Sequence, residues 1–196
     1  LAYFLAFKSK RAKPFLESIV TLPLVLPPTV IGFYLIVFFS PDTPLGKFFI
    51  LLAGEQLIFS FYGLVLASII YSLPFWVQPL QSSLEKIGND TLKTSESLGA
   101  SKFDTFINVI VPLSKKGFLT SFIISFAHTM GEFGIVLMVG GGIHGKTKVI
   151  AISIYDHVEQ LSFGKAHFLA GGMLILSFII LLTLFYSNKR SMVKVK

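Results

Sequence analysis

The chain has 196 residues, of which 53% are hydrophobic and only 14% charged, and its mean hydropathy is +0.76. Soluble domains usually carry about 25% charged residues, so this composition favours lipid as the surrounding solvent. The sequence contains no cysteine, which excludes a disulfide framework, a thiolate metal site and a cysteine nucleophile. We therefore expect an all-α membrane protein.

Four apolar runs are long enough, at about 20 residues each, to cross a hydrocarbon core of about 30 Å. The opening stretch, residues 1–7, is too short to span and is interpreted as the end of a truncated helix. Prolines in the first complete run remove backbone donors, so that helix is expected to be kinked or broken. One transmembrane domain, residues 1–196, is predicted, with complete spans at 18–40, 57–79, 117–139 and 166–187.

Basic residues are concentrated on one side of these spans, and Lys and Arg are retained on the cytoplasmic side of short loops. Of the 17 Lys and Arg residues, 13 precede the first span, lie in residues 80–116 or follow the last span. This asymmetry predicts that residues 80–116 and the C-terminus are cytoplasmic, and that the loops around Pro41 and Gly140 are external. The net charge of +7 is thus a topology signal, and nucleic acid is not expected as a partner.

The long stretch 80–116 combines polar and apolar residues at near-helical spacing. Asn89 and Asp90 are candidate helix N-caps, and one or two short amphipathic helices are predicted after them. An amphipathic helix lying on the membrane surface would show the same pattern. The pattern alone therefore leaves a protein contact and a lipid contact open.

Spacing within this stretch favours a protein contact. Gly99 and the run Val109, Val111 and Pro112 are separated like the glycine and the Ile-x-Leu-Pro element in the EAA loop of ABC importer permeases, which the segment resembles. In that family the loop forms a coupling helix that docks on the ATPase subunit. The sequence departs from the family pattern by having Lys-Thr-Ser in place of Glu-Ala-Ala. The resemblance implies these coupling residues: Lys93, Thr94, Ser95, Gly99, Ala100, Ser101 and Pro112.

Two further segments narrow the resemblance. Residues 22–30 with Gly32, and residues 131–134 followed by Leu137 and Met138, are similar to segments of molybdate or tungstate ABC permeases. The resemblance implies the helical bundle of a type I importer permease, which moves an oxyanion by alternating access. Molybdate is the first expectation, with tungstate and sulfate or thiosulfate as alternatives.

The resemblance also implies the partners and the location. A second copy of the permease, an ABC ATPase dimer on the cytoplasmic side and a soluble substrate-binding protein outside are expected, all at the bacterial or archaeal cytoplasmic (inner) membrane. The chain itself is expected to be no enzyme and to bind no cofactor, since ATP and Mg are used by the partner ATPase. The rival from another class is an ion-gradient-driven secondary transporter, which would require additional helices and inverted halves.

Glu132 is the only carboxylate well inside an apolar run, and His128 stands four residues before it, on the same face of a helix. A charge near the bilayer centre costs at least ~2.5–3.5 kcal/mol, so such residues usually face a protein interior or a wet pathway. Glu132 is therefore interpreted either as gating machinery or as a structural anchor. Members of the resembled family often have arginine at the position of His128. A neutral histidine there would weaken an ion pair with Glu132 and make that pair sensitive to pH.

The prolines of the first run have two interpretations as well. They bend the helix only, or they free backbone donors that line an anion path beside a threonine hydroxyl. The candidate pathway or gate residues are Pro27, Pro28, Thr29, His128 and Glu132.

Residues 140–147 fit the phosphate-loop pattern G-x-x-x-x-G-K-[ST] letter for letter. A phosphate loop follows a buried strand and opens a helix, whereas this segment follows a predicted span on the external side. We interpret it as an external turn, in which Lys146 and Lys148 could attract an anion or a delivery protein. Further on, Asp156, His157 and Glu159 are too irregularly spaced to predict a metal site.

Overall fold

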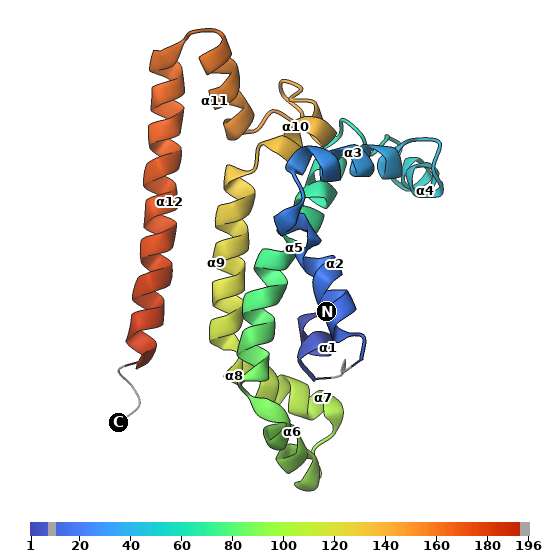
Figure 1. The fold of residues 1–196 in the computed structure, drawn as a ribbon, viewed down its shortest axis with the longest axis vertical. Helices are drawn as coiled ribbons and strands as arrows, with labels where there is room; N and C mark the ends of the chain where they lie inside the picture. The colour runs from blue at the N-terminus through green and yellow to red at the C-terminus, as the bar shows by residue number, and fades with distance from the viewer. Residues whose placement is uncertain (8–10, 193–196) are drawn as a thin grey trace. The chain divides into compact units, whose positions relative to one another are not determined.

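The computed structural model describes residues 1–7 and 11–192, and these residues form helices and loops without a strand (Figure 1). Four of the basic residues that indicate the topology, Lys8, Lys10, Lys194 and Lys196, lie outside the described residues. The elements are α1 (Ala2–Phe7), α2 (Lys13–Val25), α3 (Pro28–Phe39), α4 (Pro44–Ala53), α5 (Phe61–Glu85), α6 (Gly88–Ser97), α7 (Lys102–Thr105), the π-helix η1 (Phe106–Ile110), α8 (Val111–Leu113), α9 (Lys115–Gly131), α10 (Gly134–Gly140), α11 (Ile150–Glu159) and α12 (Phe163–Met192).

The chain forms two compact units, each built from separate segments of the sequence. Unit 1 comprises Leu1–Thr21, Pro74–Phe126 and Leu181–Lys196, and unit 2 comprises Leu22–Leu73 and Ala127–Ile180. In unit 2, α3 packs on α10. In unit 1, α2 is bonded to the second half of α5, and α6 to α7.

Within the described residues, α5 and α12 are each long and apolar enough to cross a membrane. Two bent pairs raise the number of spans to four if each pair counts as one. The first pair is α2 with α3, which is bent by 112° at the break where the prolines predict one. The second pair joins 102–113 to 115–130 with a bend of 66°, so it includes residues that the sequence analysis assigns to the cytoplasmic loop.

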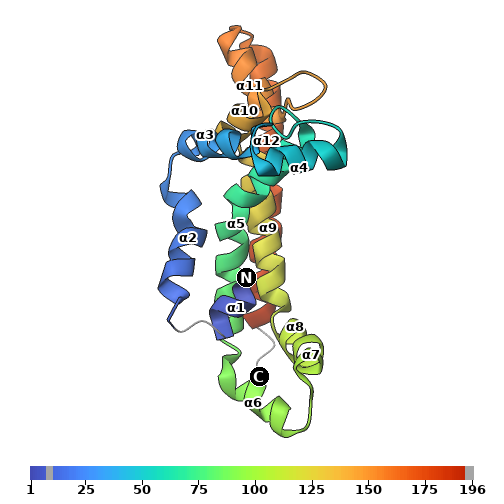
Figure 2. The ribbon, with the colours of Figure 1, turned by 90° about the vertical axis from the view of Figure 1, so that its right-hand side faces the viewer.

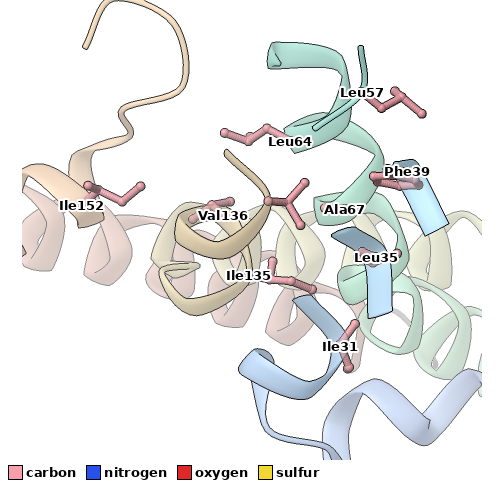
Figure 3. Packing of buried hydrophobic residues seen from close by; sticks show 10 residues of the cluster. Ile31, Leu35, Phe39, Leu57, Leu64, Ala67, Ile135, Val136 and Ile152 are labelled. Atoms are coloured by element: carbon pink, nitrogen blue, oxygen red, sulfur yellow. The ribbon is translucent and has the colours of Figure 1, made fainter. Parts of the chain in front are cut away.

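The core of unit 2 consists of buried aliphatic and aromatic side chains from α3, α5, α10 and α11, together with Leu57 before α5 (Figure 3). Ile31, Leu35 and Phe39 recur every four residues along α3, so they share one helix face. Ile135 of α10 lies beside this face, as Figure 3 shows, and Val136 belongs to the same cluster. Burial of this face fixes the position of α10 and therefore of the residues just before it.

Glycines allow α3 and α10 to approach closely. A Cβ atom added to Gly32 would come 2.8 Å from the Cβ of Met138, and one added to Gly134 would come 2.7 Å from the Cβ of Pro28. Both separations are too short for carbon atoms in contact. Small residues at such crossings are typical of membrane helix pairs.

Gly134→Ala is therefore expected to destabilise the protein by about 1–3 kcal/mol, since one added methyl group overpacks the crossing. Gly131→Ala is the matched control three residues earlier, because a Cβ there meets nothing within 4 Å. The measurement is the thermal unfolding midpoint of both purified variants in detergent. Equal midpoints for the two variants would show that the close crossing of α3 and α10 is absent.

The predicted span 117–139 contains a break in the helix, since α9 ends at Gly131 and α10 begins at Gly134. The backbone at Phe133 leaves helical geometry (φ −122°, ψ −55°). Oε1 of Glu132 accepts a hydrogen bond from the backbone N–H of Ile135 at 3.2 Å. The carboxylate thus satisfies one of the donors that a new helix leaves free at its start.

Two further features differ from the sequence-based expectations. Asn89 and Asp90 do not cap a helix, because α6 already begins at Gly88 and its N-cap position, Ile87, makes no side-chain bond. The loop after the first span is also shorter than expected, since residues 44–53 form α4. Thr43 caps α4 by accepting from the N–H of Gly46 at 3.0 Å.

Candidate functional site

The predicted coupling segment forms the corner between α6 and α7 in unit 1 (Figure 2). Gly99 ends α6 with φ +84°. Its N–H bonds the carbonyl of Glu96 at 3.0 Å, and the N–H of Ala100 bonds the carbonyl of Ser95 at 3.2 Å. This pair of bonds is the Schellman motif, which favours glycine because the left-handed backbone penalises a Cβ atom.

Side-chain bonds stiffen the same corner. The hydroxyls of Ser95 and Thr105 share a hydrogen bond of 2.9 Å that ties α6 to α7. Ser101 caps α7 by accepting from the N–H of Asp104 at 3.1 Å. Two large apolar side chains next to the corner point into solvent, since Leu98 is 84% exposed and Phe103 is 76% exposed. The corner is therefore a firmly bonded element that presents apolar surface.

The remaining predicted coupling residues are less confined. Lys93 and Thr94 are exposed on α6, and Pro112 is exposed on α8. The hydroxyl of Thr94 bonds back to the carbonyl of Asp90 at 2.9 Å. Thus Ser95, Gly99, Ala100 and Ser101 are brought together at the corner, while the others lie along the flanking helices.

A second group of polar side chains lies in unit 2, around the break between α9 and α10. Glu132 is only 7% exposed, and its Oε2 lies 3.9 Å from Nε2 of His128. The hydroxyl of Ser72 is hydrogen-bonded to Nδ1 of His128 at 3.1 Å and to the hydroxyl of Thr129 at 2.8 Å. The ring of Tyr71 lies against the imidazole, with centroids 5.2 Å apart.

Sequence patterns did not indicate Tyr71 or Ser72, which lie on α5 more than fifty residues before His128. The only local signal is a hydroxyl in the middle of an apolar run, which needs a partner when it is buried. One of the predicted prolines, Pro28, lies close to this group. It faces Gly134, which is two residues after Glu132. Pro27 precedes α3 and Thr29 lies exposed in its first turn.

A ladder of polar pairs joins α2 to α5 in unit 1 and was also not predicted. Nζ of Lys13 lies 2.6 Å from Oε1 of Glu85, and Nε2 of Gln81 donates to Glu17 at 2.6 Å and to Glu85 at 3.0 Å. Gln78 donates to Thr21 at 3.2 Å. These pairs satisfy polar groups that would otherwise face the apolar environment between helices.

The loop that resembles a phosphate-binding sequence is closed by its own side chains. Thr147 is buried, and its hydroxyl donates to the carbonyl of Gly140 and accepts from the N–H of Ile143. Lys146 forms an ion pair with Glu55 at 2.9 Å, and Lys148 is paired with Asp156. The loop follows the C-terminal end of α10, where the helix dipole disfavours a phosphate.

The polar residues of α11 are also paired locally. The hydroxyl of Tyr155 donates to Oε1 of Glu159 at 2.6 Å, and this bond raises the pKa of Tyr155. In residues 1–7 and 11–192, no group of three His, Cys, Asp or Glu side chains is arranged to hold a metal ion.

Comparison with known proteins gives the family. The family model described as "Binding-protein-dependent transport system inner membrane component" matches residues 1–189. The molybdenum transport system permease protein ModB of Azotobacter vinelandii is 50% identical over 190 residues, which are 97% of this chain and 84% of that protein. The sulfate transport system permease protein CysT of Synechocystis sp. is 32% identical over 170 residues, which are 87% of this chain and 59% of that protein.

The fold is also found among solved structures. The structure of a bacterial alginate ABC transporter in complex with an alginate pentasaccharide-bound periplasmic protein includes a similar chain, with a TM-score of 0.67 at 14% identity. The match covers 96% of this chain and 69% of that one. It confirms the predicted all-helical fold of an ABC transporter permease. The chain belongs to the family of inner membrane components of binding-protein-dependent transport systems.

Proposed function

We propose that this chain is the membrane-spanning permease subunit of an ABC importer that takes up molybdate. The choice of molybdate as the substrate rests on the 50% identity with the Azotobacter vinelandii molybdenum permease over 97% of the chain. The sulfate permease of Synechocystis sp. is 32% identical over a smaller share of this chain, so sulfate is the second candidate. Tungstate, as a tetrahedral dianion like molybdate, is the third.

The corner between α6 and α7 is proposed to dock on an ABC ATPase dimer in the cytoplasm. Exposed Leu98 and Phe103 provide apolar surface of the kind that an interface buries. The bond between Ser95 and Thr105 stiffens the corner, so closure of the ATPase dimer can be passed on as a movement of whole helices. The C-terminus is proposed to be cytoplasmic as well, because the basic residues after the last span favour that side.

The chain is proposed to have no ATPase site of its own. A nucleotide would need the phosphate-loop backbone to be open and its lysine to be available. In residues 140–147 the backbone N–H of Ile143 is already bonded to the hydroxyl of Thr147, and Lys146 is already paired with Glu55. ATP and Mg would therefore bind the partner ATPase only.

Two copies of the chain are proposed to enclose the pathway, because a two-fold pair of permeases can place equivalent helices around one channel. An external soluble binding protein would deliver the oxyanion. Pro27, Pro28 and Thr29 lie at the break between α2 and α3 and are candidates to line the path. The bonds of Glu132 support an anchoring role, since its carboxylate serves the backbone of α10.

The test uses the purified permease with its ATPase partner in lipid vesicles. ATPase activity is measured while the cognate binding protein is added with molybdate, with tungstate, with sulfate or without an anion. Molybdate-loaded protein is expected to stimulate hydrolysis most. Stimulation by sulfate alone would show that sulfate, not molybdate, is the substrate. Uptake that needs an ion gradient but no ATPase would contradict the assignment as an ABC importer.

A further inference from the structure

Unit 1 contains a cavity of about 660 Å³ that none of the proposed roles uses. It is lined by the end of α5, the start of α6 and the corner between α8 and α9. Its volume falls within the range of about 300–1,000 Å³ that is usual for small-molecule sites. The charge pattern of the sequence assigns this end of the helices to the cytoplasm.

Two lysines from separate segments line the cavity, Lys86 in the turn after α5 and Lys116 at the start of α9. No acidic residue is among the lining residues. Within the described residues, neither ammonium group forms an ion pair, and the neighbouring carboxylate of Glu85 is bonded to Lys13 and Gln81 instead. Two like charges at one cavity repel each other, and a bound anion would offset that repulsion by attracting both ammonium groups.

Hydroxyl groups supply further donors. Ser82, Ser83 and Thr120 line the same cavity, and in the part of the chain that the structure describes their hydroxyls have no hydrogen-bond partner. Thr91 also lines it, but its hydroxyl already donates to the carbonyl of Ile87 at 2.8 Å. The cavity therefore combines two cations with three uncommitted hydroxyl donors.

The start of α9 adds to this environment. Lys116 and Gly117 both belong to its first turn, where the helix dipole is positive and attracts anions. Gly117 is buried, and a side chain at this position would collide with Ser83. A glycine is thus what allows α9 to approach α5 and brings the lysine of one helix to the hydroxyls of the other.

We propose that this cavity, with Lys86, Lys116, Ser82, Ser83 and Thr120, is a binding site for a tetrahedral oxyanion on the cytoplasmic side of the membrane. Ammonium groups with hydroxyl donors match the several acceptor oxygens of such an ion. Two sources share this chemistry, the phosphate of an anionic lipid headgroup and a free oxyanion in the cytoplasm. The lipid headgroup fits better, because the cavity is much larger than one bare oxyanion and basic pockets between helices on the cytoplasmic side bind headgroups.

The test measures binding to the purified permease alone, by native mass spectrometry and by the shift of its thermal unfolding midpoint. The probes are phosphatidylglycerol, phosphatidylcholine, sodium molybdate and inorganic phosphate. The pocket variant carries Lys86→Gln and Lys116→Gln. Its matched control carries Lys102→Gln and Lys115→Gln, which removes the same charge from exposed lysines of the same loop that do not line the cavity.

The pocket variant is expected to bind the anionic probe about tenfold more weakly for each lysine removed, which corresponds to about 1.4 kcal/mol per lysine, because each removal loses a hydrogen bond from a charged donor. The control variant should bind like the parent protein. Lys86→Arg with Lys116→Arg keeps the charges and should also bind, which guards against a variant that merely misfolds.

The probes then separate the two sources. Phosphatidylglycerol bound in preference to phosphatidylcholine, with no binding of molybdate or phosphate, identifies the lipid headgroup. Molybdate or phosphate bound with the same dependence on Lys86 and Lys116 identifies a free oxyanion. If no anionic probe distinguishes the pocket variant from its control, the site is overturned. No ATPase or binding protein takes part, so this failure would leave the proposed import function standing.

Discussion

Gly99→Trp is expected to reduce the ATPase stimulation by substrate-loaded binding protein about 10- to 100-fold, since overpacking a docked surface costs about 1–3 kcal/mol. A Cβ atom added to Gly99 meets nothing within 4 Å inside the chain. The position next to Gly99 is therefore open, and a large side chain there is expected to collide with a partner that docks on the corner between α6 and α7. The measurement is ATPase activity of the assembled importer in lipid vesicles.

The control for this substitution comes from the same chain. Gly54 ends α4, a ten-residue helix like α6, with φ +74° and with no atom within 4 Å of an added Cβ. Gly54→Trp therefore carries the same backbone strain, about 1–2 kcal/mol for a side chain in the left-handed region. It lies in the loop region that the charge pattern places outside, so ATPase stimulation should remain near that of the parent.

A smaller residue gives an intermediate case. Gly99→Asn is expected to retain more stimulation than Gly99→Trp, because asparagine adopts positive φ more readily than other residues with a side chain. If Gly99→Trp couples as well as Gly54→Trp, the corner is not the docking contact. Loss of coupling in both variants would mean that strain at the helix end, not a collision, is responsible.

The features that could be predicted from the sequence are those with local causes. Pro27 and Pro28 predict a broken helix because proline lacks a donor and clashes with the preceding turn. Gly99 could be singled out through the spacing of the resembled loop, and the structure adds the physical reason, a positive φ at the end of α6. The start of α4 also has a local cause, since Thr43 caps the helix and Pro44 suits its first turn, although a loop was expected there.

The features that could not be predicted depend on contacts between distant segments. In the sequence Ser72 is only a small residue within an apolar run. In the structure its hydroxyl lies 3.1 Å from Nδ1 of His128. Lys146 completes a phosphate-loop pattern in the sequence, yet its partner Glu55 is 91 residues away. Single-sequence patterns report helix periodicity and turns, whereas a tertiary pair is determined by how the helices pack.

The anchoring role of Glu132 leads to a test that separates structure from transport. Glu132→Ala is expected to lower the thermal unfolding midpoint and the uptake together. The substitution removes the acceptor for the N–H of Ile135, and a lost cap costs about 0.5–2 kcal/mol. Within the described residues, that donor has no other partner at the start of α10.

Glu132→Gln distinguishes the two interpretations of this residue, because an amide oxygen can still accept from Ile135 while the charge is gone. If Glu132 is an anchor, this variant keeps the unfolding midpoint of the parent and an uptake within about twofold of it. Glu55→Gln is the matched control, since it neutralises a carboxylate that is paired with Lys146 outside the apolar runs. A Glu132→Gln protein that unfolds like the parent but no longer takes up the oxyanion would show that the carboxylate charge itself serves the pathway or its gate.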